Sequence, residues 1–273
     1  MMRLETSDGW LLTTQPEHAR VAAVFAEHWR NERFEAPEPF ASVHAAVLHH
    51  DDSWAESDAN PSLTDDGTPS AFSRELVGTY DAFENVHLDK YLKVRAAATE
   101  AIAGTDPYAA AVISMHSLNL LTEQADLSAL DADNLTLHAD WVTHQRARQA
   151  QLREQCRANP QMAPHASDAH FERAFRFLQA CDNLSLCLCV ELPTETTLRH
   201  RHPTREGTDV VLHYKPHGQM RFSVAPWPFD QPELCVPFTT RRITGRAFPS
   251  DAAYREAYFA APETTVEAVL TPA

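Results

Sequence analysis

The sequence predicts a mainly α-helical protein with a short N-terminal hairpin and a small C-terminal antiparallel β-meander. Apolar residues recur at the three- and four-residue spacing of an amphipathic helix through most of residues 14–190. Capping residues and helix breakers divide this stretch into separate helices. After Pro193 the pattern changes to that of β-strands. We therefore expect a helical core over residues 1–195 and a β-meander with a C-terminal extension over residues 196–273, packed together as a single structural unit.

The chain opens with a hairpin and a well-marked helix start. Residues 4–12 form two short extended runs around an Asp-Gly dipeptide, which is suited to positive φ in a tight turn. Thr14, followed three residues later by Glu17, has the spacing of a capping box, in which the two side chains bond to each other's backbone amides. Apolar residues then continue to Trp29, which predicts a helix up to that point.

The other elements follow from the same spacings. A second helix is predicted at residues 40–52, and a loop rich in Asp, Asn, Ser, Pro and Gly follows it at residues 57–69. Helical spacing returns at residues 73–83, 88–103, 107–121 and 134–158, and in a helix that is capped by Ser167 and runs to about Val190. Extended runs at residues 210–214, 220–224 and 234–240 form the meander, with His217 and Gly218 at its first turn.

The composition is that of an acidic protein. Thirty-eight acidic and 23 basic residues give a net charge of −15, which repels nucleic acid and anionic membranes over most of the surface. The longest apolar run, residues 184–190, is far below the roughly 18 residues of a membrane span. The five cysteines show no Cys-x-x-Cys spacing and are expected to be core thiols in a reducing compartment. We expect a cytoplasmic protein that acts on a small molecule and has neither a nucleic-acid nor a membrane partner.

Five polar side chains fall on helix faces that should point inward, because each shares a stripe with the apolar residues of its helix. They are His18, His50, Asp51, His116 and Asp182. A buried carboxylate is strongly disfavoured unless it is paired, hydrogen-bonded or bound to a metal. Imidazole nitrogens and carboxylate oxygens together bind divalent zinc, iron, manganese or cobalt. The pattern therefore predicts one buried site for one or two such ions.

Simpler roles exist for each of these residues alone. An inward-facing histidine is more often a hydrogen-bonded core residue than a ligand, and Asp182 could pair with an arginine or cap a backbone amide. His44 and His87 fit structural roles better than ligand roles. The combination of three histidines and two aspartates, more than any single residue, favours the metal.

The order of these residues resembles a known superfamily. His18 on one helix, the adjacent His50 and Asp51 on the next, and Asp182 on a much later helix follow the H…HD…D order of the histidine-aspartate (HD) metalloproteins, which are helical and mostly metal-dependent phosphohydrolases. Over nearly its whole length the chain also resembles an uncharacterised bacterial family of unknown function. The phrases that carry this second resemblance are residues 14–19, 50–54, 114–116, 181–186 and 226–229.

The HD resemblance implies specific roles. His18, His50, Asp51 and Asp182 would be the first ligands, and Asp51 would bridge two ions if two are bound. Asp51 and His116 would be the catalytic residues, His116 as a ligand of the second ion or a substrate contact. His49 and Asp52 flank the pair His50 and Asp51 and would either support the ligands, with the carboxylate orienting a ligating imidazole, or be solvated. Independently of this resemblance, Lys90, Lys93 and Arg95 could hold a phosphate, although a solvated cationic face is the more common role for such residues.

Three functions remain open at this point. A divalent ion that activates water favours a hydrolase, and specifically a phosphohydrolase acting on a small phosphorylated metabolite or nucleotide. The alternatives are an oxygenase of the HD type with two irons, and a non-enzymatic, metal-stabilised sensor or interaction protein. The sequence does not predict the oligomeric state.

Overall fold

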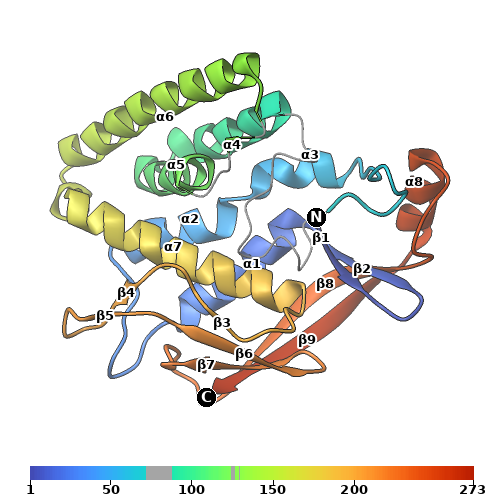
Figure 1. The fold of residues 1–273 in the computed structure, drawn as a ribbon. Coiled ribbons are helices and arrows are strands. Elements are labelled where there is room, and N and C mark those ends of the chain that lie inside the picture. Colours follow the sequence, from blue (N-terminus) through green and yellow to red (C-terminus); the bar gives the residue numbers. More distant parts are fainter. Residues whose placement is uncertain (72–87, 124–126, 129) are drawn as a thin grey trace.

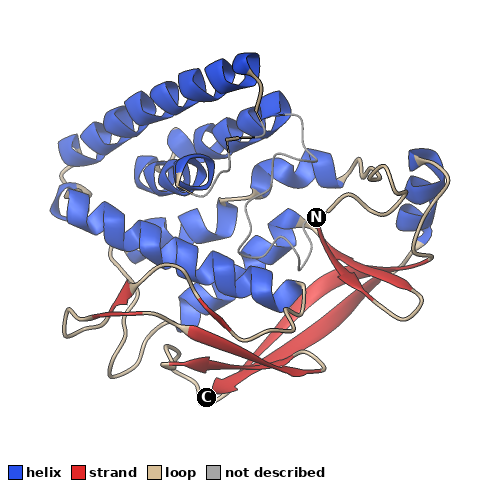
Figure 2. Ribbon diagram, viewed as in Figure 1, coloured by secondary structure: helices blue, strands red, loops and turns tan. Residues whose placement is uncertain are grey.

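A layer of helices covers one face of a long, twisted sheet (Figures 1 and 2). The computed structural model describes residues 1–71, 88–123, 127–128 and 130–273, so the helix predicted at residues 73–83 and His87 lie outside the described residues. The described helices are α1 (Gln15–His28), α2 (Phe40–His49), α3 (Ala55–Asp58), α4 (Leu88–Ala103), α5 (Pro107–Thr122), α6 (Ala132–Ala158), α7 (Asp168–Cys189) and α8 (Asp251–Ala260), with 3-10 turns η1 (Asp52–Trp54) and η3 (Ala163–His165). None of them is long and apolar enough to cross a membrane.

Seven strands form the main sheet, in the order β1-β2-β8-β9-β7-β6-β3. They are β1 (Met2–Glu5), β2 (Gly9–Thr13), β3 (Thr196–Thr197), β6 (His213–Gly218), β7 (Arg221–Ala225), β8 (Leu234–Thr244) and β9 (Glu263–Pro272). A separate pair is formed by β4 (His202–Pro203) and β5 (Asp209–Val210).

The prediction of a mainly α, HD-type helical bundle with a small meander is wrong, and so is the all-α description. The N-terminal hairpin joins the C-terminal strands, because β2 pairs with β8 in the register Gly9 to Thr244. The last strand, β9, lies between β8 and β7 and runs parallel to β7, so the expected antiparallel meander is part of a mixed sheet. Pairing between the two ends of the chain leaves no trace in local spacing, which is why the sequence analysis did not predict the sheet. The sequence analysis also missed α8, although its cap at Ser250 is a local signal.

The predicted helices that correspond to α1, α2, α4, α5, α6 and α7 are confirmed, whereas the short α3 was not predicted. The first helix shows how helix and sheet are joined. Thr14 caps α1, its hydroxyl accepting the amide of Glu17 at 3.2 Å. Glu17 does not return the bond. Its carboxylate accepts the amide of Thr239 in β8 at 2.7 Å and also contacts Arg20. The Thr14 half of the predicted capping box is therefore present, whereas Glu17 anchors α1 to the sheet instead.

Four helices pack around the position of the five polar residues. Helix α1 contacts α2 and α7, and both α2 and α7 contact α5. Helices α1 and α7 lie next to the sheet, while α6 lies on the far side of the helical layer (Figure 1). Trp29 at the end of α1 packs edge-on against Phe177 of α7, with ring centroids 5.3 Å apart. Such aromatic packing fixes the relative position of the two helices.

Candidate metal centre

All five residues predicted to bind metal come together in the structure. His18 lies on α1, His50 and Asp51 at the end of α2, His116 on α5 and Asp182 on α7, and none is more than 5% exposed. Their ligand atoms form two groups, His18-His50-Asp51 and His50-His116-Asp182, and within each group the atoms lie within 4.8 Å of one another. These buried groups could hold a metal ion.

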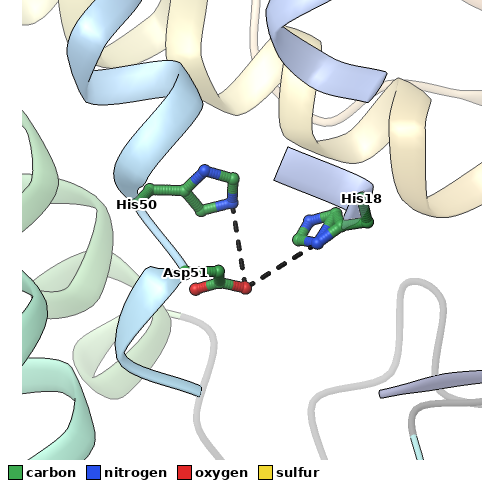
Figure 3. A group of neighbouring side chains, drawn as sticks. All are labelled: His18, His50 and Asp51. Atoms are coloured by element: carbon green, nitrogen blue, oxygen red, sulfur yellow. Dashed lines mark ion pairs between the residues drawn. The ribbon is translucent and has the colours of Figure 1, made fainter. Parts of the chain in front are cut away.

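The end of α2 explains how two consecutive residues reach one site. Neighbours in a continuous helix point about 100° apart. Here α2 ends at His49, His50 keeps helical angles (φ −60°, ψ −25°), and Asp51 leaves them (φ −121°, ψ 12°) before η1 begins. The break turns the Asp51 carboxylate back toward His50, and Figure 3 shows one of its oxygens facing the rings of both His50 and His18.

The hydrogen bonds of His18 and His50 define which nitrogen is free. Nδ1 of His18 donates to the Gln15 carbonyl at 3.0 Å, and Nδ1 of His50 donates to the Val47 carbonyl at 2.7 Å. A carbonyl oxygen only accepts, so Nδ1 carries the proton and a neutral ring keeps its lone pair on Nε2. Both Nε2 atoms face the same oxygen, Oδ1 of Asp182, at 3.0 Å from His18 and 3.3 Å from His50. A lone pair and a carboxylate oxygen repel each other unless a proton or a metal ion lies between them.

His116 is held in the same way by a residue that the sequence analysis missed. Its Nδ1 donates to Oε1 of Gln179 at 2.9 Å, and the amide of Gln179 donates in turn to Asn119 at 2.9 Å. This leaves Nε2 of His116 as the free nitrogen. Gln179 is buried and lies one helical turn before Asp182 on α7, and this shared stripe was the signal that could have identified it.

The charges of the site hold Asp51 ionised. Burial by itself raises the pKa of Asp51, but the Arg95 guanidinium, with Nη1 2.5 Å from Oδ1, and the nearby imidazoles together hold it well below its usual range. The pKa of Asp182 is likewise lowered, because the surrounding histidines outweigh its burial.

The three imidazoles differ in protonation. Burial lowers the pKa of His18 and of His116 to about 4. Burial also disfavours charge on His50, but the carboxylates of Asp51 and Asp182 outweigh it and raise the pKa of His50 to about 9. Without a metal ion, a single proton on His50 therefore separates its Nε2 from the two carboxylates at neutral pH.

The remaining predicted residues lie outside this cluster, with one exception. His49 and Asp52 are exposed and pair with each other at 2.6 Å. His44 pairs with Glu27. Lys90 is exposed, and Lys93 pairs with Asp89 at the surface. Arg95, also predicted to hold a phosphate, is buried on the inner face of α4 against Asp51.

A cavity of about 380 Å³ lies between α1, α3, β8 and α8, and none of the five clustered residues lines it. Its charged residues are paired: Arg20 contacts Glu17, Arg241 contacts Glu263, and Asp58 contacts the N-terminal amine of Met1. The geometry therefore points to the buried cluster as the candidate site.

Residues 1–245 match a family described as "Protein of unknown function (DUF3891)". No curated protein and no solved structure matches the chain. That description assigns no activity, so the HD-domain and hydrolase descriptions expected from the sequence gain no support from it.

Proposed function

We propose that this chain, which belongs to the family of unknown function matched over residues 1–245, is a metal-dependent hydrolase acting on a small phosphorylated metabolite or nucleotide. One observation supports the proposal above others. In the buried cluster, His18, His50 and His116 each donate Nδ1 to a protein oxygen. His18 and His50 also direct Nε2 at the buried Oδ1 of Asp182. Histidines that bind metal are oriented in this way by their second nitrogen.

The donor set suits manganese, iron, zinc or cobalt, because it combines imidazole nitrogens with carboxylate oxygens. Cys181 lies beside Asp182 in the chain, but it belongs to neither group of ligand atoms, and burial raises the pKa of its thiol well above the usual value. A divalent ion in such a site lowers the pKa of bound water and polarises a phosphoryl oxygen. The protein residues would hold the ion, and their burial would exclude bulk water from it.

We also place the protein in the cytoplasm. Its five cysteines are free, and four of them are buried. Unpaired buried thiols are typical of a reducing compartment.

The test is metal analysis combined with a phosphatase screen. Untagged protein is stripped with a chelator, reconstituted with manganese, cobalt, zinc or iron, and assayed for phosphate release from nucleotides and phosphomonoesters. We expect bound metal at about one equivalent or more, a higher melting temperature on metal addition, and phosphate release. His50→Ala should lose the metal. His49→Ala, its exposed neighbour, is the matched control and should retain it.

Each outcome separates the possible functions. Less than about half an equivalent, with no change in melting temperature, would refute a metal site. Bound metal without phosphate release, but with dioxygen consumption by the iron-loaded protein, would support the oxygenase. Bound metal with neither activity would support a sensor or interaction protein.

A further inference from the structure

The two groups of ligand atoms share His50, and this ring has only one nitrogen to offer. Its Nδ1 donates to the Val47 carbonyl at 2.7 Å, which leaves Nε2. An imidazole nitrogen has one lone pair and binds one ion. The groups His18-His50-Asp51 and His50-His116-Asp182 therefore cannot both be complete three-ligand sites at the same time.

Arg95 already occupies one oxygen of Asp51. Its Nη1 donates to Oδ1 at 2.5 Å, and both side chains are buried. The guanidinium also lies over the rings of Trp54 and Tyr91, at 5.5 and 5.2 Å from their centroids, and these contacts hold a cation in place. Only Oδ2 of Asp51 faces the histidines, at 3.8 Å from Nε2 of His50. With Oδ1 engaged by Arg95, Asp51 cannot bridge two ions with one oxygen on each.

The charge of the buried cluster agrees with this geometry. Asp51 and Asp182 contribute two negative charges, and Arg95 contributes one positive charge. One divalent ion would leave a single excess positive charge, which suits an anionic substrate group. A second divalent ion would leave three positive charges among residues that are almost completely buried, and unpaired buried charge is strongly unfavourable.

We infer that the centre binds a single ion and that Arg95 takes the place of a second cation on Asp51. Arg95 is thus a positioning residue that directs Oδ2 of Asp51 toward the ion. The inference rests on the proposed metal site and names its stoichiometry. It also removes the second iron that the oxygenase alternative would need.

The experiment is a manganese titration followed by elemental analysis and electron paramagnetic resonance. The wild-type protein should bind about one equivalent and give the six-line spectrum of an isolated Mn(II) ion. Arg95→Met frees Oδ1 of Asp51 and removes the positive charge, so it should take up a second, weaker equivalent. Lys93→Met, which removes one positive charge from the exposed face of the same helix, and Arg95→Lys, which keeps the buried charge, should both remain at one equivalent.

Two equivalents with a coupled spectrum in the wild-type protein would overturn the inference and leave the proposed metal site intact. A single equivalent in folded Arg95→Met would overturn the role of Arg95. If circular dichroism shows that Arg95→Met is unfolded, the wild type and Arg95→Lys still test the inference, because each should bind one equivalent and two equivalents in either would contradict it. Absence of metal from the wild type would instead refute the proposed function itself.

Discussion

Acid should loosen the contact between α1 and α7 through His202. This residue of β4 is completely buried, with its ring centroid 4.9 Å from that of Trp29 on α1 and 5.6 Å from that of Phe177 on α7. Neither of its ring nitrogens has a hydrogen-bond partner in the described part of the chain. Burial, reinforced by Arg173 and Arg176, lowers the pKa of His202 to about 3. Its protonation would therefore act on the two helices that carry His18 and Asp182.

The sign and size of this pH effect follow from the difference between the pKa of His202 in the folded protein and its pKa in the unfolded chain. The folded-state pKa lies below the unfolded value of about 6.5, so the stabilisation is complete above about pH 6.5 and is lost as the pH falls toward 3. At about pH 4.5 the unfolded chain binds a proton that the folded chain still excludes. Over this interval of about two pH units, the free energy of unfolding should fall by about 3 kcal/mol because of His202 alone.

The variant His202→Leu isolates this effect, since it removes the titrating ring at similar volume and leaves the other acid-sensitive groups unchanged. At pH 7 we expect its stability to lie within about 1.5 kcal/mol of the wild type. Denaturant unfolding of both proteins at pH 7 and pH 4.5 gives the comparison, and acidification should favour the variant by about 3 kcal/mol. Parallel losses in the two proteins, within about 1 kcal/mol, would refute the assignment to His202.

Three further predictions concern the cluster itself. Asp51→Ala leaves the buried charge of Arg95 unpaired and should cost the metal-free protein about 3–5 kcal/mol. Asp182→Ala removes the partner of imidazoles, which can become neutral, so its loss of unfolding free energy should be clearly smaller. Both variants should lose metal in elemental analysis. Equal unfolding free energies for the two variants would contradict the charge argument. Gln179→Leu removes the acceptor that orients His116 and should weaken metal binding about 10- to 100-fold in competition with a chelating dye, while an unchanged affinity would exclude that role. Because the pKa of His50 is raised to about 9, the stabilisation that His50 gives the metal-free protein should be complete below about pH 6.5 and should fall by about 3 kcal/mol as the pH rises through 9. His50→Gln should abolish this alkaline loss in melting experiments.

Helix α4 separates what local spacing predicts from what only the fold decides. The sequence offers Lys90, Lys93 and Arg95 as possible phosphate contacts. The stripe that begins at Leu88 contains residues 91, 92 and 95, so helical spacing alone places Arg95 inward and both lysines outward. The structure agrees with this spacing: Arg95 is buried, and the lysines are exposed. The partner of Arg95, however, lies on a different element, and no spacing within α4 could identify Asp51.

The sequence by itself determined the features that depend on neighbours within about one helical turn. These are the cap at Thr14, the extent of the main helices, and the inward position of the five polar residues, since helical periodicity alone sets which face a side chain shares. The tertiary structure alone decided the features that depend on distant segments meeting. These are the mixed sheet between the two ends of the chain, the orientation of His116 by Gln179, and the pairing of Asp51 with Arg95. Such contacts arise from the packing of whole helices and strands. Local propensity does not indicate which side chains this packing brings into contact.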